Sequence, residues 1–312
     1  MLALPERGFA RSVDRHNVEL DVLCDWIEGS LLFSTGRVSQ PDVADVLCET
    51  NVYSRKEFAN DRVSDAWSEL RKRQTLIGHS SPYRFEGLSV FRDVHPWKDA
   101  PAHSFCVMLS MAEWHPKWAG GFGRDYTEQG RLFEDLTKEA VENLFLGWRV
   151  CQTGWSRSSP RKLAGIVDTV ASLLDETVGD VKKWTTRHAN EAGLDLVCWN
   201  PFPDGRGCYP TLLFQCASGS DWPKKLEAPD LKVWTRLVGF RAQGFPRKAF
   251  STPLALLDEE FDRACNKVDG LLMDRYRLLA PGLRKQNWVS TELAQRIGKW
   301  AKPRQAKLPL LS

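Results

Sequence analysis

Three polar side chains occur within apolar stretches of the sequence and could act together as oxygen donors. They are Glu134, in a predicted helix, Asp195, between two leucines, and Gln215, after Leu-Phe. A carboxylate buried in a strand costs free energy unless it is paired or holds a cation. With a backbone carbonyl such as that of Cys216, these oxygens suit Mg²⁺ or Mn²⁺, ions that retain waters and bind substrate phosphates. Such an ion assists phosphodiester hydrolysis.

Two predicted strands would position this group. Residues 194–199 and 211–217 are apolar and flank a turn signal at 203–206, which predicts a hairpin. Side chains alternate along strands, so hairpin pairing could bring Asp195 and Gln215 together. Each residue also has an ordinary explanation: Glu134 as a surface acid, Asp195 as a loop cap, and Gln215 as a backbone hydrogen-bond partner.

Three segments of the sequence form a pattern. They are Gly130-Arg-Leu-Phe-Glu134 on a helix that ends at Gly147-Trp148, Glu191-Ala-Gly-Leu-Asp195, and Phe214-Gln215-Cys-Ala217. Over about residues 130–226 the pattern resembles the PD-(D/E)xK restriction-endonuclease-like superfamily, in its Mrr-like branch, which has an FE-bearing helix, an acid-x-G-x-D segment and a QxK strand. The resemblance implies that Asp195 is the central metal ligand, that Gln215 replaces the second ligand, and that Glu134 is the helix acid. Glu191 falls at the first acid of the acid-x-G-x-D segment.

The sequence departs from this family at one position. The family's lysine, which orients and activates the attacking water, is replaced by Ala217. Either a lysine from another backbone position serves, with Lys224 and Lys225 as the nearest candidates, or the domain binds nucleic acid without cutting it. We favour the first alternative because the acids of the pattern are present.

The residues from 130 to 312 are predicted as one α/β domain with a central mixed sheet and basic C-terminal helices. Helical and strand periodicities alternate along it. The expected helices are 131–147, 159–176, 257–279 and 290–300, and the expected strands are 148–151, 194–199, 211–217 and 233–240.

The first 93 residues predict a separate module. Three helical segments precede a hairpin, with a capping-box pattern at Ser39, and this is the order of a winged helix-turn-helix. The third helix would then read a DNA groove, although such modules also dock proteins. The basic residues expected to contact nucleic acid are Arg62, Arg71, Lys72 and Arg73 from this helix, with Arg284 and Lys285 from the C-terminal region.

Residues 94–129 are rich in Pro, Trp and Gly and predict a linker with one strand at 103–111. His95, His103 and His115 have no metal-ligand spacing, so hydrogen-bonded histidines are expected. The glycines at 120–123 do not form a GxGxxG pattern between a strand and a helix, which argues against a phosphate-binding loop.

Composition limits the function classes. The 312 residues are 42% hydrophobic and 27% charged, which excludes a mainly disordered chain. Eight cysteines without CxxC pairs argue against a disulfide framework or structural zinc. The net charge of +3 does not by itself indicate a nucleic-acid partner, but residues 281–312 carry seven Lys or Arg and one acid. That segment is either a phosphate-contacting surface or a solvated basic face.

The sequence therefore predicts a cytoplasmic protein with no membrane span or signal peptide. The expected function is Mg²⁺-dependent DNA cleavage, which the resemblance associates with restriction or antiviral defence. The alternatives are a catalytically degenerate nuclease fold that acts as a nucleic-acid-binding or assembly subunit of a defence complex, and a ligand-sensing transcription regulator. A homodimer is expected if both strands of a duplex are cut at one place.

Overall fold

The computed structural model describes residues 1–9, 18–123, 126–153, 163–184, 192–242, 244 and 246–311. Contacts divide the chain into two compact units. Unit 1 comprises Met1–Asp125, Pro253–Leu256 and Arg275–Ser312, and unit 2 comprises Tyr126–Thr252 and Leu257–Asp274. Residues 275–312 thus belong with the N-terminal part rather than with the α/β domain, unlike the expected boundaries.

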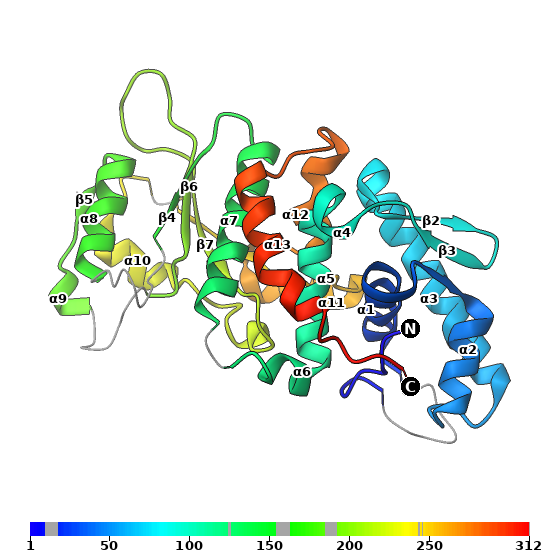
Figure 1. Ribbon diagram of the computed structural model, residues 1–312. Helices are drawn as coiled ribbons and strands as arrows, with labels where there is room; N and C mark the ends of the chain where they lie inside the picture. The colour runs from blue at the N-terminus through cyan, green and yellow to red at the C-terminus, as the bar shows by residue number, and fades with distance from the viewer. Residues whose placement is uncertain are drawn as a thin grey trace. The chain divides into compact units, whose positions relative to one another are not determined.

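The N-terminal part of unit 1 has the element order expected from the sequence. Helices α1 (Leu20–Ser30), α2 (Gln40–Glu49) and α3 (Lys56–Ile77) precede the hairpin of β2 (Tyr83–Glu86) and β3 (Ser89–Arg92), and β1 (Arg37–Ser39) pairs with β3. The predicted capping box is confirmed, because Ser39 Oγ accepts from Asp42 N and Asp42 Oδ2 accepts from Ser39 N. The result is a three-stranded antiparallel sheet in the order β1-β3-β2 beside three helices (Figure 1).

The predicted linker is helical instead. Its elements are α4 (Pro96–Asp99), α5 (Pro101–Trp114) and α6 (Pro116–Gly120), so the strand expected at 103–111 is wrong. Every residue from Ala102 to Met111 is buried. A helix that is apolar on all sides lacks the amphipathic period that distinguishes a helix from a buried strand.

Unit 1 is completed by the C-terminal residues. These form α12 (Arg275–Leu279), the 3-10 helix η4 (Ala280–Leu283) and α13 (Thr291–Gln305). Ser290 caps α13, its Oγ accepting from Leu293 N at 3.2 Å. The chain ends lie side by side in Figure 1, where Leu2 forms a β-bridge with Leu310.

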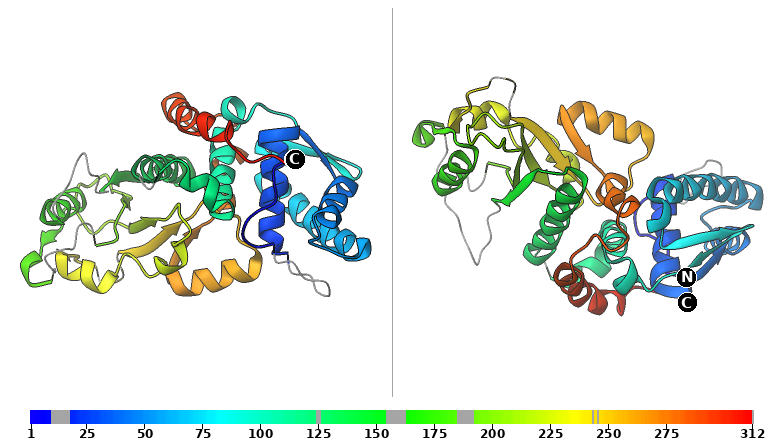
Figure 2. Two further views of the ribbon diagram at one scale, coloured as in Figure 1. Left: turned by 60° about the horizontal axis from the view of Figure 1, so that its bottom comes forward. Right: turned by 90° about the horizontal axis from the view of Figure 1, so that it is seen from above.

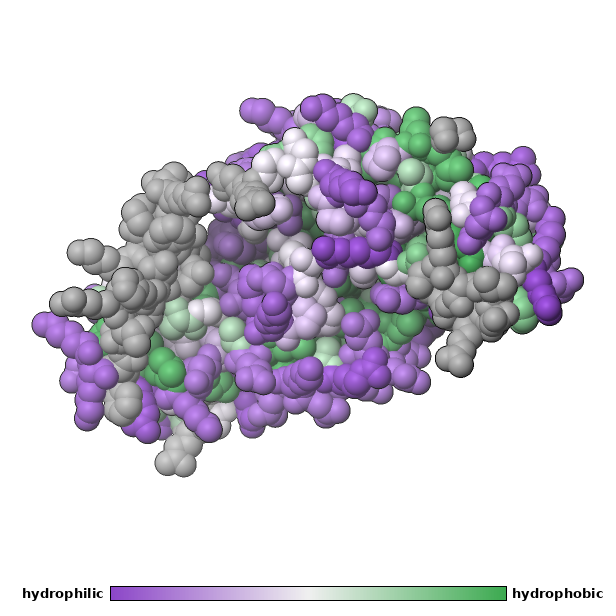
Figure 3. Space-filling model, turned by 90° about the horizontal axis from the view of Figure 1, so that it is seen from below, coloured by the Kyte–Doolittle hydropathy of each residue, from purple (hydrophilic) through white to green (hydrophobic). Residues whose placement is uncertain are grey.

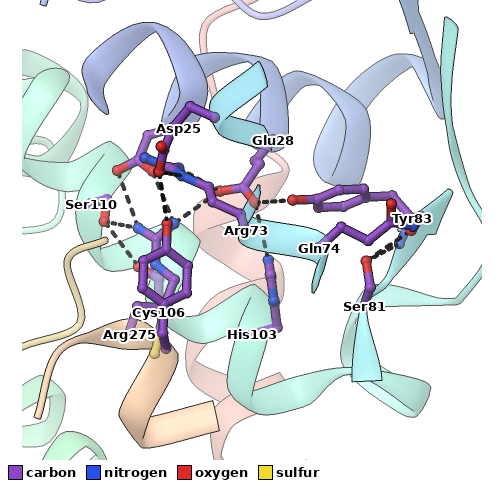
Figure 4. Close-up of polar contacts among 12 residues, drawn as sticks. Asp25, Glu28, Arg73, Gln74, Ser81, Tyr83, His103, Cys106, Ser110 and Arg275 are labelled. Carbon is purple, nitrogen blue, oxygen red and sulfur yellow. Dashed lines mark hydrogen bonds and ion pairs between the residues drawn. The ribbon is translucent and has the colours of Figure 1, made fainter. Parts of the chain in front are cut away.

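A buried ionic cluster lies in the core of unit 1 (Figure 4). Arg73 from α3 and Arg275 from α12, each 1% exposed, both donate to Asp25 and Glu28 of α1 at 2.8 to 3.1 Å. Burial alone would raise the pKa of Glu28, but Arg73, His103 and Arg275 lower it below its usual range. The cluster therefore consists of charges that compensate each other inside the fold.

Unit 2 is a mixed α/β unit with a central five-stranded mixed sheet. Its strand order is β10-β9-β7-β6-β4, antiparallel from β4 to β7 and parallel from β7 to β10. The strands are β4 (Arg149–Gln152), β6 (Leu196–Trp199), β7 (Thr211–Cys216), β9 (Arg247–Ser251) and β10 (Gly270–Met273). The strands predicted at 148–151, 194–199 and 211–217 are confirmed. The hairpin predicted for 194–199 and 211–217 is also confirmed, because β6 pairs antiparallel with β7.

Helices cover both faces of this sheet. Figure 2 shows α7 (Thr127–Leu144) along one face, with α10 (Leu231–Leu237) and α11 (Asp258–Val268) along the other. An apolar core joins α8 (Leu163–Leu174) and α10 to β6 and β7 through Ile166, Val170, Val197, Leu213 and Trp234. Smaller elements are β5 (Thr177–Val178), α9 (Val181–Trp184), the 3-10 helix η3 (Trp222–Lys224) and β8 (Val238–Gly239).

Two predictions for this region are wrong. The strand expected at 233–240 is mostly α10, which Asp230 caps by accepting from Lys232 N at 2.8 Å. The helix expected at 257–279 is interrupted by β10, after Asp269 ends α11 with a φ of 50°.

Hydrophilic side chains cover much of the face seen in Figure 3, with smaller hydrophobic areas between them. Within the described residues, no helix combines the length and the apolar character needed to cross a membrane.

Candidate functional site

Asp195 and Gln215 meet at the end of the β6–β7 hairpin. The carboxylate is 6% exposed and Gln215 is 8% exposed. Gln215 Nε2 donates to Asp195 Oδ2 at 2.5 Å, and Cys216 N donates to the same oxygen at 2.6 Å. The pairing predicted from strand alternation thus brings these two residues into direct contact.

A β-bulge sets the position of Asp195. Leu196 is the register partner of Phe214, yet the Asp195 N–H donates to Phe214 O at 2.8 Å. Two successive residues therefore face one residue of β7, which is the pattern of a bulge. Bulges redirect a side chain, and here the extra residue is the one whose carboxylate reaches the Cys216 N–H.

The backbone on both sides of Asp195 is held in place. Thr153 N donates to Asp195 O at 2.8 Å, and Thr153 Oγ1 donates to Leu194 O at 2.8 Å. Before it, Ala192 and Gly193 both have positive φ, 49° and 69°. A Cβ on Gly193 would lie 2.9 Å from Ala228 Cβ and 3.3 Å from Gln215 Oε1, so the close packing here requires glycine.

Two oxygens converge on one point in this site. Gln215 Nε2, which lies 2.5 Å from Asp195 Oδ2, is also 3.2 Å from the carbonyl oxygen of Cys216. The NH2 group of Gln215 thus lies between Asp195 Oδ2 and the Cys216 carbonyl oxygen, two of the predicted metal ligands. A rotation of the Gln215 side chain that withdraws the amide nitrogen would open that place and let Gln215 Oε1 face it.

Glu134 approaches the same region from α7. Burial raises the pKa of the Cys216 thiol well above its usual value, and the nearby negative charges of Asp195 and Glu134 raise it further, whereas hydrogen bonds with Ser251 and Thr137 lower it. Thr137, one turn after Glu134, also bonds Ser251 Oγ at 3.1 Å. Both predicted acids therefore act on one thiol at the end of β7.

The fit to a divalent cation is partial. Asp195, Gln215 and the Cys216 carbonyl provide hard oxygen donors of the kind that Mg²⁺ binds. However, no group of three or more His, Cys, Asp or Glu side chains in the described part of the chain is arranged to hold a metal. A site here would depend on amide and backbone oxygens in addition to carboxylates. Glu191, at the first acid of the acid-x-G-x-D segment, lies outside the described residues.

The loop that follows β7 packs beside the site. Lys224 is exposed, and Lys225 forms an ion pair with Asp221 at 3.4 Å. Lys225 O accepts from Ala228 N at 2.9 Å, and Ala228 is the residue that packs on Gly193. Ala217, where the sequence pattern led us to expect a lysine, is 1% exposed.

Sequence reasoning missed Lys248, a further cation beside this loop. It lies on β9, in register with Leu213 and two residues before Phe250, the register partner of Gln215. Its Nζ donates to Glu227 O at 3.3 Å. Only the parallel pairing of β7 with β9, distant in sequence, places it here.

The predicted nucleic-acid residues have mixed outcomes. Arg73 lies in the buried ionic cluster and cannot reach a phosphate, which corrects that prediction. Arg62 donates to Val18 O, and Lys72 lies 3.9 Å from Glu69. Three residues are exposed: Arg71, which donates to Gly87 O at 2.9 Å, Arg284 and Lys285.

Comparisons with known proteins give little guidance. No family model matches the sequence, and no curated protein matches it. A search of solved structures finds the restriction endonuclease FokI bound to DNA, with 9% sequence identity and a TM-score of 0.26 over 91% of this chain. The chain spans 48% of the FokI chain. The function is therefore inferred from the residues and geometry of this chain.

Proposed function

We propose that unit 2 hydrolyses phosphodiester bonds in DNA with the help of Mg²⁺, in restriction or antiviral defence. The observation that carries this proposal is the convergence of Asp195 Oδ2 and the Cys216 carbonyl on one point, 2.5 and 3.2 Å from Gln215 Nε2. Two oxygens fixed at the end of a hairpin, next to a side-chain amide that can rotate, can serve as ligands of a cation.

The residues of this site have distinct tasks in the proposal. Asp195, the Cys216 carbonyl and the turned amide of Gln215 hold the ion, and Glu134 adds negative charge from α7. When bound, Mg²⁺ stabilises the attacking and leaving oxygens of the reaction. Lys224, Lys225 or Lys248 supplies the ammonium that orients the attacking water in place of the lysine missing at Ala217.

Plasmid cleavage tests this proposal. The full chain is incubated with supercoiled plasmid and Mg²⁺ or Mn²⁺, and with EDTA. We expect cleavage with the metal that is abolished by EDTA and by Asp195→Asn, a nearly isosteric change. Asp204→Asn, in an exposed turn of the same unit, is the matched control and retains cleavage. Cleavage by Asp195→Asn at the unaltered rate would contradict the proposal.

A second candidate function is DNA binding without cleavage. The observation that favours it is the buried Ala217 at the position of the family's lysine, together with an amide nitrogen that already occupies the space between the two oxygens. In this case the chain is a nucleic-acid-binding or assembly subunit of a defence complex. DNA binding that is insensitive to EDTA, with no cutting under any metal, would favour this candidate.

We also propose that the N-terminal part of unit 1 is a winged-helix module. Its support is the helix order and the β1-β3-β2 sheet. The first half of α3 carries Glu57, Asp61 and Asp65 at intervals of four residues, all exposed, and such acids repel phosphates. We therefore favour docking of a partner protein, or of a second copy, over groove reading by this half of α3.

A further inference from the structure

The exposed side of α13 is a cationic surface. Lys299 and Lys302 are exposed on the helix, and Lys307 is exposed just after it. The only acid between residue 281 and the end of the chain is Glu292, in the first turn of α13, where the helix dipole stabilises it. The cations of the later turns thus lie away from this acid.

Arg304 is held rigidly within this surface. Its guanidinium carbon lies 4.0 Å from the centre of the Trp300 ring and 4.8 Å from that of Phe122, and its Nη1 donates to Trp300 O at 2.8 Å. Trp118 of α6 donates from Nε1 to Arg304 O at 3.1 Å. The Lys307 ammonium also lies over Phe122, at 5.4 Å. A cation fixed in this way loses little entropy when it binds an anion.

The opposite side of α13 anchors the helix in unit 1. Leu293, Ile297 and Ala301 are buried, and Trp300 packs edge-on against Phe105 of α5 at 5.4 Å. The exposed side therefore displays charge without the large apolar residues that an interfacial membrane helix would insert into lipid. Its chemistry fits a polyanion in water rather than a lipid surface.

We propose that Lys299, Lys302, Arg304 and Lys307, the α13 cationic face, bind the phosphate backbone of duplex DNA without reading its sequence. The identity of the ligand rests on the proposed function, but the surface belongs to unit 1 and does not include Asp195 or Gln215. Arg304 lies over the Trp300 ring, and Arg304 and Lys307 lie over the Phe122 ring, so the ring faces that these cations cover are not open for stacking on unpaired bases. The surface consequently favours the denser charge of a duplex over a single strand.

Fluorescence anisotropy tests this proposal. The full chain is titrated against a labelled duplex and a single strand of the same length, in EDTA, over a series of salt concentrations. The variant Lys299→Gln/Lys302→Gln is compared with Lys182→Gln/Lys183→Gln, which removes two exposed lysines from α9 of unit 2. We expect the first pair to weaken duplex binding at least about tenfold and to reduce the salt slope by up to about 1.8, and the control to change neither.

A second variant tests the role of the fixed arginine. Arg304→Leu removes the charge and keeps an apolar contact with the two rings, and we expect duplex binding to weaken while circular dichroism and thermal unfolding stay close to wild type. Equal losses in the α13 and α9 lysine variants would overturn the proposal. Tighter binding of the single strand, or binding only to vesicles of anionic lipid, would also overturn it.

The design separates this proposal from the proposed function. Binding is measured in EDTA, so it does not depend on cleavage. If Asp195→Asn binds the duplex as tightly as wild type while neither protein cuts plasmid with Mg²⁺, the cleavage proposal fails and the α13 cationic face stands. If plasmid is cut and the α13 variant binds and cuts like wild type, the opposite holds.

Discussion

Buried acids occur in both units, but their surroundings differ. In unit 1, Asp25 and Glu28 form ion pairs with Arg73 and Arg275 at distances of 2.8 to 3.1 Å. In unit 2, the uncharged N–H groups of the Gln215 amide and the Cys216 backbone donate to the Asp195 carboxylate. The first arrangement balances charge within the fold, and the second positions an acid with dipoles.

The difference separates structural acids from a candidate site. The buried ionic cluster joins α1, α3 and α12, which are distant in sequence. Removing one of its charged side chains leaves an opposite charge buried without compensation. An acid that amide N–H groups orient at a strand end, beside a bulge and a loop that carries lysines, is the arrangement that we assign to the candidate site. Four predictions would break or sharpen this contrast.

The largest effect is expected in unit 1. Arg275→Met keeps an unbranched side chain close to the aliphatic part of arginine but removes its bonds to Asp25, Glu28, Ser110 and the Pro253 carbonyl. We expect a loss of about 3–5 kcal/mol in the free energy of unfolding, measured in urea. Lys56→Gln, which breaks an exposed ion pair with Asp45, is the control and should leave unfolding unchanged. A loss in Arg275→Met no larger than in the control would remove the contrast.

Unit 1 should also be sensitive to acid. Burial lowers the pKa of His115 from 6.5 to about 4, so the unfolded chain binds more protons than the folded chain between these values. Stability therefore falls as the pH drops from about 6.5 to 4, by about 3 kcal/mol. The lowered pKa of Glu28 adds a further loss below pH 4.5. His115→Gln should flatten the upper part of this pH profile, and an unchanged profile would contradict the assignment.

At the candidate site, Gly193→Ala should have an intermediate effect. The residue has a φ of 69°, and the added Cβ would lie 2.9 Å from Ala228. We expect about 1–3 kcal/mol of destabilisation in a urea titration, with reduced plasmid cleavage because Asp195 and Gln215 shift. Gly165→Ala on α8, where a Cβ meets nothing within 4 Å, is the control and should be neutral or stabilising. If both variants had the same free energy of unfolding and the same plasmid cleavage, the close packing around Gly193 would not be needed to position Asp195 and Gln215.

Asp195→Asn should have the smallest effect on stability. The amide oxygen of asparagine can still accept from Cys216 N, so we expect a change of no more than about 1.5 kcal/mol. Loss of cleavage with this small change in unfolding would distinguish the site from the ionic cluster. A loss in stability as large as that of Arg275→Met would instead make Asp195 a structural acid.

The local features of the site could be predicted from the sequence. Alternation in two short apolar strands and a turn between them predict that Asp195 and Gln215 come together, and their side chains are in contact. The bulge at Asp195 could not be predicted, because it depends on how Thr153 and Phe214 bond to the backbone on each side. Lys248 was missed for the same reason, since β9 follows β7 only after a helix and two short elements.

The wrong predictions in unit 1 also come from contacts that are distant in sequence. Arg73 follows Arg71 and Lys72 and looks like part of a surface patch, but its acidic partners lie 48 and 45 residues earlier. The prediction of a strand at 103–111 is wrong because α5 is enclosed on all sides, by α1 and α13 among others, and its sequence therefore lacks the amphipathic period of a helix. Sequence periodicity reports burial on one side and cannot report burial on every side.

The enclosure of α5 has a consequence for synthesis on the ribosome. Residues 101–114 emerge early, whereas α13, which packs on them, is made almost two hundred residues later. A nascent chain therefore carries α5 with the side that α13 covers still exposed while the whole of unit 2 is translated. Unit 1 reaches its native fold only after release of the C-terminal residues, so we expect its maturation to follow that of unit 2 and to depend most on chaperones that shield apolar segments.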